Sequence, residues 1–131
     1  MFKFSTSSIN NMKGVHPDLI KIANKAIGIT WVDFGIPRYG GLRTSDIQKE
    51  LFIEGVSRCD GIIKKSKHQE GLALDFFAYV NGKASWRKDY LTIIAAAFLQ
   101  SAIELKIKIE WGGWWKGFPD MPHIQLIQDK G

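Results

Sequence analysis

The segment over residues 86–105 constrains the fold most strongly, because it is the longest stretch of the chain with helical periodicity. Three consecutive alanines within it favour a helix further. Its apolar residues recur at spacings of three and four: Tyr90, Leu91, Ile94, Ala97, Phe98 and Leu105. The pattern predicts a long helix with one apolar face, which must pack against the other elements of the chain.

Shorter helical and alternating patterns share the rest of the chain. Helices are predicted over residues 17–27, with Pro17 at the first turn, and from Ser45 to about Gly55, where Ser45-Asp46-Ile47-Gln48 has the form of a capping box. Strands are predicted over residues 30–36, 72–80, 106–111 and 123–127, with a loop over 56–67 and turns at Gly40-Gly41 and Asn81-Gly82. This order predicts an α+β domain, in which about three helices pack on a mainly antiparallel sheet.

The composition fits one globular domain of 131 residues, since 45% of the residues are hydrophobic and 24% are charged. A single cysteine, Cys59, excludes an internal disulfide framework. Lys and Arg number 18 against 13 Asp and Glu, a net charge of +5. The excess fits either a solvated surface or an acidic partner, such as nucleic acid or an anionic cell envelope.

Neither an export signal nor a membrane span is recognisable in the sequence. Residues 1–12 lack the apolar core of a secretory signal. The longest apolar run, over residues 93–99, has seven residues, far short of the ~18 that suggest a spanning helix. We therefore expect a soluble protein that does not insert into membranes.

The first group of chemistry-bearing residues lies around the second of the three histidines. His16 precedes Pro17 at a predicted helix start and is interpreted as a capping or surface residue. His68 ends the basic loop, and Asp75 lies inside a predicted apolar strand, where a buried carboxylate needs a partner. A metal ion or a buried arginine would serve. From this segment alone, a surface histidine and a salt-bridged aspartate are an equal alternative.

The second group lies over residues 110–123, where three of the five tryptophans are interspersed with glycines and prolines. Such a segment is either an aromatic loop that covers the core or one wall of a cleft. With His123, the two groups contain two histidines and an aspartate, the donor types of a catalytic zinc site that keeps a position for water. A further carboxylate, Asp120 or Glu110, could act as the general base. Residue types alone do not establish such a site.

Three motifs in the chain resemble those of the VanY-like zinc peptidases. Ser66-x-His68-x-x-Gly71-x-Ala73-x-Asp75 is similar to the family's S-x-H-x-x-G-x-A-x-D motif, and Gly41-Leu42-Arg43-Thr44 with Gln48 is similar to its upstream segment. Trp111-Gly112-Gly113, Trp115, Phe118, Asp120 and Pro122-His123 resemble the W-G-G-x-W-x-x-F-x-D-x-P-H stretch of the endopeptidase branch, which includes phage endolysins. The family contains D-alanyl-D-alanine carboxypeptidases and L-alanyl-D-glutamate endopeptidases. The resemblance extends over about residues 16–126.

The resemblance implies one zinc ion held by His68, Asp75 and His123, at the sheet and in a cleft. It also implies that Asp120 is the catalytic acid and base. We prefer Asp120 to Glu110 because it lies three residues from His123, in a loop rather than in a strand.

Five other residues receive roles that are less closely defined. Arg43 matches the arginine that holds a substrate carbonyl or carboxylate and stabilises the oxyanion. Ser66, Glu110, Trp111 and Trp114 are expected to contact the substrate or to support the metal ligands. Trp114 departs from the branch, where this residue is usually small or polar, and this leaves the shape of the substrate cleft open.

The implied protein is a single peptidase catalytic domain over residues 1–131, without a separate cell-wall-binding domain. We expect it to cleave the L-alanyl-D-glutamate bond of the peptidoglycan stem peptide, as a monomeric phage endolysin that binds no nucleic acid. Without a signal peptide, it would accumulate in the host cytoplasm and reach the wall after a holin opens the membrane. One alternative is a D-alanyl-D-alanine carboxypeptidase. A more remote one is a non-catalytic module that binds peptidoglycan or nucleic acid.

Overall fold

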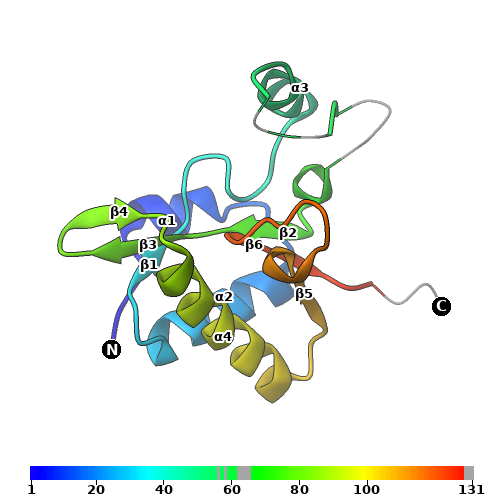
Figure 1. The fold of residues 1–131 in the computed structure, drawn as a ribbon. Coiled ribbons are helices and arrows are strands. Elements are labelled where there is room, and N and C mark those ends of the chain that lie inside the picture. Colours follow the sequence, from blue (N-terminus) through cyan, green and yellow to red (C-terminus); the bar gives the residue numbers. More distant parts are fainter. Residues whose placement is uncertain (56, 58, 62–65, 129–131) are drawn as a thin grey trace.

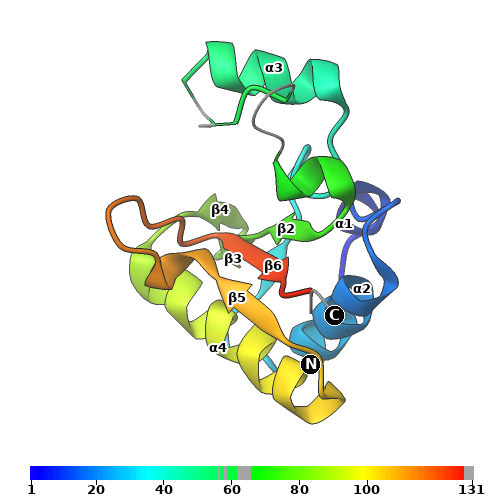
Figure 2. The same cartoon turned by 90° about the vertical axis from the view of Figure 1, so that its right-hand side faces the viewer.

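Two helices, α2 (Pro17–Ile29) and α4 (Lys88–Leu105), pack against each other and form one layer of the fold (Figure 1). The computed structural model describes residues 1–55, 57, 59–61 and 66–128. Two small β-sheets lie over the helix pair, and a view from the side shows the same layering (Figure 2). The predicted α+β architecture is confirmed.

The predicted long helix is confirmed as α4, which begins two residues later than the pattern suggests. Its buried face includes Ile94, Phe98 and Ala102. The ring of Phe98 lies 5.2 Å from the rings of both Phe34 and Phe76, so the helix packs against β1 and against the residue that connects β2 to β3. No helix in the described part of the chain is long and apolar enough to cross a membrane.

The predicted helix at Pro17 is also confirmed, and it begins as its sequence suggests. His16 is the N-cap residue, and its Nδ1 accepts a hydrogen bond from the backbone N–H of Asp18 at 3.0 Å. The apolar face buries Leu19, Ile22, Ala23, Ala26 and Ile27. His16 is therefore a capping residue, as predicted.

The strands form two three-stranded sheets rather than one. One sheet has the order β1 (Phe34–Gly35), β3 (Phe77–Val80), β4 (Lys83–Ser85), and the other has the order β2 (Ala73–Asp75), β6 (His123–Leu126), β5 (Ile109–Trp111). Every neighbouring pair is antiparallel, as predicted. The Asn81-Gly82 turn is confirmed between β3 and β4, and both residues have positive φ angles, 54° and 78°.

The predicted strand over residues 72–80 is divided at Phe76. The side chain of Phe76 is fully buried and stacks on Phe98, while its backbone N–H donates to the carbonyl of Pro122 at 2.9 Å. On one side of it, Asp75 pairs with His123 in the second sheet, and on the other, Phe77 pairs with Gly35 in the first. One apolar run therefore contributes a strand to each of the two sheets.

The predicted strand over residues 30–36 is largely wrong, because only Phe34 and Gly35 pair. The Oγ1 of Thr30 donates to the carbonyl of Val32 and accepts from its N–H, which closes a local turn in place of ladder bonds. Trp31, which lies in the predicted strand, is 89% exposed. The strands predicted over 106–111 and 123–127 are confirmed in the shorter forms of β5 and β6.

Two helices differ from the sequence-based expectation. The short helix α1 (Thr6–Asn11) was not predicted, and its Ser8 and Asn11 hydrogen-bond the backbone of Ile36, just after β1. Helix α3 (Ser45–Ile53) stands apart from the α2–α4 pair in both views, and its N-cap is Thr44 rather than Ser45. In the predicted loop over 56–67, residues 56, 58 and 62–65 lie outside the described residues.

We predict that Phe98→Ala lowers the free energy of unfolding by about 3–5 kcal/mol, because it leaves a cavity between α4 and the rings of Phe34 and Phe76. Ile103→Ala is the matched control on the same helix, since Ile103 is 72% exposed, and its effect should stay within about 0.5 kcal/mol. Urea unfolding followed by circular dichroism measures both. Equal effects of the two substitutions would show that the aromatic contact at Phe98 does not hold the layers together.

Candidate metal centre and active site

The pairing of β2 with β6 places Asp75 directly opposite His123. The 3-10 helix η1 (Lys67–Glu70) brings His68 to the same place. The Oδ1 of Asp75 lies 3.3 Å from Nε2 of His68 and 3.1 Å from Nδ1 of His123. The donor atoms of all three residues lie within 4.8 Å of one another, so this group could hold a metal ion.

These separations fit a metal ion between the three side chains. Tetrahedral zinc with bonds of about 2.0–2.1 Å requires donor atoms about 3.3 Å apart. The remaining nitrogens are also engaged, because Nδ1 of His68 lies 2.9 Å from the carbonyl of Gly41 and Nε2 of His123 lies 2.9 Å from Oε1 of Gln125. A neutral imidazole has one N–H. When that N–H points to the oxygen of Gly41 or Gln125, the other ring nitrogen directs its lone pair at the carboxylate of Asp75. That arrangement requires either a protonated ring or a cation between the atoms.

Electrostatic effects within this group oppose one another. Burial disfavours the charge of Asp75, but His68 and His123 outweigh it and hold the pKa of this carboxyl well below its usual range. Burial also acts to lower the pKa of His123, yet the hydrogen bond and charge of Asp75 raise it overall. The three residues thus form one coupled unit with Asp75 ionised.

Arg43 lies against the outer oxygen of Asp75, with its Nη2 3.1 Å from Oδ2. Its Nε donates to the carbonyl of Tyr39 at 2.8 Å, and its Nη1 donates to Oε1 of the fully buried Gln48 at 3.1 Å. Burial lowers the pKa of Arg43, while the charge of Asp75 opposes that effect. Arg43 therefore holds the carboxylate of Asp75 in place, and its predicted contact with the substrate stays a prediction.

Ser66 supports His68 from the start of η1. Its Oγ accepts from the N–H of His68 at 3.1 Å, and its own N–H donates to Oε1 of Gln69 at 2.9 Å, which completes a capping box. The helix ends at Gly71, whose φ of 71° is left-handed. Ser66 therefore caps the turn that carries His68, and its predicted role at the metal or substrate stays a prediction.

Asp120 lies beside the candidate metal-binding group of His68, Asp75 and His123, with its Oδ2 3.8 Å from Nδ1 of His123. Its position depends on the loop after β5, where its N–H donates to the carbonyl of Gly112 at 2.8 Å. The buried Trp111 closes the same loop, because its indole N–H donates to the carbonyl of Met121 at 2.7 Å. Burial raises the pKa of Asp120, and the charge of Asp75 raises it further.

Glu110 is connected to His123 through the side chain of Gln125. Its Oε1 accepts from the indole N–H of Trp115 at 2.8 Å, and its Oε2 accepts from Nε2 of Gln125 at 3.3 Å. No role was predicted for Gln125 or Trp115 from the sequence. The two-residue spacing between His123 and Gln125 was an available signal, since alternate residues of a strand share a face.

The aromatic residues of the loop differ in what they contact. Trp114 is 63% exposed, with its ring edge-on to Trp111 at 5.6 Å, and its predicted substrate contact stays a prediction. Beside Arg43 lies a surface hollow of ≈ 360 Å³ that also includes Leu42, Thr44, Ser45, Gln69 and Glu70. The site lies at the sheet as predicted, and this hollow adjoins it.

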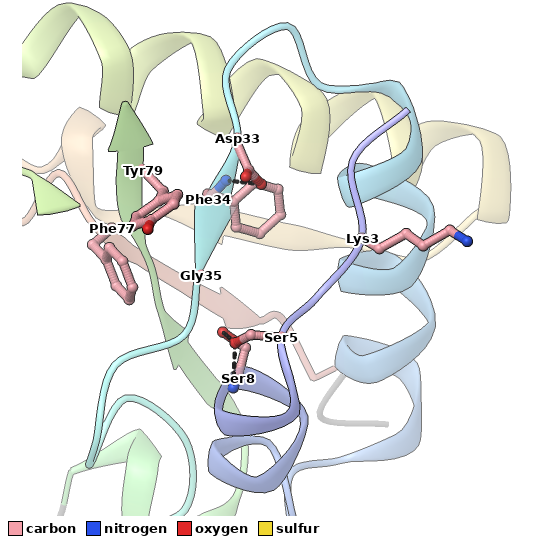
Figure 3. Close-up of a pocket in the computed structure, with 8 residues that line it drawn as sticks. All are labelled: Lys3, Ser5, Ser8, Asp33, Phe34, Gly35, Phe77 and Tyr79. Carbon is pink, nitrogen blue, oxygen red and sulfur yellow. Dashed lines mark hydrogen bonds between the residues drawn. The ribbon is translucent and has the colours of Figure 1, made fainter. Parts of the chain in front are cut away.

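A separate pocket of ≈ 300 Å³ lies at the other sheet (Figure 3). In it, the Oδ1 of Asp33 accepts from the N–H of Phe34, and the Oγ of Ser5 accepts from the N–H of Ser8. Its lining residues are Lys3, Ser5, Ser8, Asp33, Phe34, Gly35, Phe77 and Tyr79. None of these lining residues belongs to the group of His68, Asp75 and His123, so this pocket is separate from the candidate metal centre.

Known proteins share this arrangement of the chain. A family model described as phage L-alanyl-D-glutamate peptidase matches residues 1–128. The chain belongs to this family. The resemblance inferred from the motifs is therefore confirmed, and the protein is a peptidase.

Individual relatives of this peptidase carry similar names. The L-alanyl-D-glutamate peptidase of Escherichia phage T5 is 34% identical, over 96% of this chain and 98% of its own. The peptidoglycan L-alanyl-D-glutamate endopeptidase CwlK of Bacillus subtilis (strain 168) is 27% identical, over 80% of this chain and 64% of its own. The crystal structure of the Serratia marcescens L-Ala D-Glu endopeptidase ChiX aligns with a TM-score of 0.83 and 37% identity, over 95% and 90% of the two chains.

We predict that Gly112→Ala destabilises the peptidase by about 1–3 kcal/mol, because the added Cβ would collide with the backbone oxygen of Asp120. Gly28→Ala is the matched control in α2, where an added Cβ meets no atom within 4 Å, and it should raise stability by about 0.5–1 kcal/mol. Urea unfolding measures both. A neutral Gly112→Ala would mean that the loop carrying Asp120 tolerates displacement.

Proposed function

We propose that this protein is a zinc-dependent endopeptidase that cleaves the L-alanyl-D-glutamate bond in the peptidoglycan stem peptide. The observation that carries the proposal is the convergence of His68, Asp75 and His123, with Asp120 beside them. The family model and the names of the relatives support the bond and the polymer. The donor set of two imidazoles and a carboxylate supports zinc.

In the proposed reaction, Asp120 and Arg43 have different roles. Zinc, when bound, polarises the scissile carbonyl and makes a bound water more acidic. Asp120 takes a proton from the attacking water and passes it to the leaving amine. The raised pKa of Asp120 suits this exchange, because a base works best when its pKa approaches the working pH. Arg43 holds Asp75 and brings a positive charge to the site at which the carbonyl oxygen becomes negative.

The proposed site of action follows from the same family. We propose that the protein works as a monomer on the bacterial cell wall, and that it reaches the wall from the host cytoplasm after a holin opens the membrane. The phage family supports a lytic role. The net charge of +5 favours approach to an anionic envelope.

We expect purified protein to release stem-peptide fragments with new alanine carboxyl ends and new glutamate amino ends from stripped cell walls. Mass spectrometry of the digested muropeptides measures this. A zinc chelator should abolish the release, and added zinc should restore it. Free D-alanine as the product would instead indicate a D-alanyl-D-alanine carboxypeptidase, and full activity after zinc removal would exclude the metal mechanism.

We expect Asp120→Asn to lower the rate of hydrolysis by about 10²–10⁴-fold, because the amide cannot accept the proton of the water. The variant should still bind one zinc ion per chain, measured by elemental analysis after dialysis. Asp89→Asn is the control, since Asp89 is exposed on α4 and pairs with Arg87. If Asp120→Asn keeps its activity, another group must be the base.

A further inference from the structure

The two oxygens of Glu110 are each held by a different donor. The indole N–H of Trp115 donates to Oε1 at 2.8 Å, and Nε2 of Gln125 donates to Oε2 at 3.3 Å. An ionised carboxylate can only accept hydrogen bonds. Glu110 therefore turns the NH₂ group of the Gln125 amide toward itself.

The orientation of Gln125 decides which nitrogen of His123 carries the proton. With its NH₂ group on Glu110, Gln125 presents Oε1 to Nε2 of His123 at 2.9 Å. A carbonyl oxygen can only accept, so Nε2 must carry the N–H of a neutral ring. The lone pair is then on Nδ1, the nitrogen that faces Oδ1 of Asp75 at 3.1 Å.

We propose that Glu110 and Gln125 are positioning residues that fix the tautomer of His123, so that Nδ1 is its metal-binding nitrogen. The inference rests on the zinc site of the proposed function. Trp115 contributes twice, because its N–H fixes Glu110 and its ring lies 5.0 Å from the ring of His123. Glu110 is thereby committed to supporting a ligand, which leaves Asp120 as the base.

The other histidine is set differently. Nδ1 of His68 lies 2.9 Å from the backbone carbonyl of Gly41, so its N–H is on Nδ1 and Nε2 faces Asp75. The two ligands therefore use opposite ring nitrogens. The proton of His68 is positioned by the backbone, whereas that of His123 is positioned by side chains, which substitution can remove.

Glu110→Gln tests the orientation most directly. The amide has one acceptor, which Trp115 occupies, so its NH₂ group faces Gln125 and favours a reversed Gln125. A reversed Gln125 presents its own NH₂ group to His123, and this moves the proton to Nδ1 and opposes metal binding. Gln125→Met removes the acceptor with little change of shape. Loss of a residue that hydrogen-bonds a metal ligand typically weakens metal affinity by about 10–100-fold.

The experiment titrates zinc into the metal-free full-length protein in competition with a chromogenic chelator. Glu110→Gln and Gln125→Met should each weaken zinc binding by about 10–100-fold, while Gln100→Met, on the exposed surface of α4, should bind as the wild type does. Imidazole ¹⁵N NMR gives the second readout. The zinc-bound wild type should show N–H on Nε2 of His123, and Glu110→Gln at the same zinc concentration should shift toward N–H on Nδ1. Circular dichroism checks folding, and Gln125→Met carries the test if Glu110→Gln does not fold.

The outcomes separate this inference from the proposed function. Wild-type zinc affinity in both variants, with N–H retained on Nε2, would overturn the positioning role while leaving the peptidase proposal intact. Wild-type protein that binds zinc but leaves the L-alanyl-D-glutamate bond uncut would overturn the proposed function alone. Wild-type protein that binds no zinc would overturn both.

Discussion

The antiparallel register between β2 and β6 is the constraint on which the site depends. It places Asp75 opposite His123, two residues that lie 48 positions apart in the chain. A shift of one residue would turn every side chain of one strand to the opposite face. The register is held by the buried neighbours Leu74 and Ile124, which pair directly with each other and are both fully buried. The core therefore aligns Asp75 with His123, two of the candidate metal ligands.

That register brings ionisable groups into a space with little solvent, and each group is stable only because of its neighbours. Asp75 would be costly to bury alone. Arg43 contacts one of its oxygens, and His68 and His123 contact the other. Arg43 is itself oriented by the buried Gln48. A zinc ion bound between the three ligands would balance the same charges and meet the nitrogen lone pairs that face Asp75.

The loop after β5 places Asp120, the proposed base, beside His123 through close backbone packing. Gly112 has no side chain at a point where a Cβ would meet the backbone of Asp120, and Trp111 ties the far end of the loop to Met121. The Trp-Gly-Gly motif is thus a packing requirement. The same loop supplies Trp115, which joins Glu110 and Gln125 to the ring of His123. The proposed base and the proposed support of a metal ligand therefore come from one short segment.

The sequence by itself determined the helices at Pro17 and over 86–105, because their apolar spacing and caps are local. It also predicted which residues meet at the candidate site, since His68, Asp75, His123 and Asp120 stand in recognisable motifs. Only the tertiary structure decided that the run over 72–80 divides at Phe76 between two sheets, and that residues 30–32 close a turn instead of pairing. The proposed proton positions of His68 and His123 could likewise not be predicted from local sequence patterns. They depend on hydrogen bonds that the rings donate to the carbonyl of Gly41 and to Oε1 of Gln125, and Gly41 meets His68, as Glu110 meets Gln125, only once separate segments pack together.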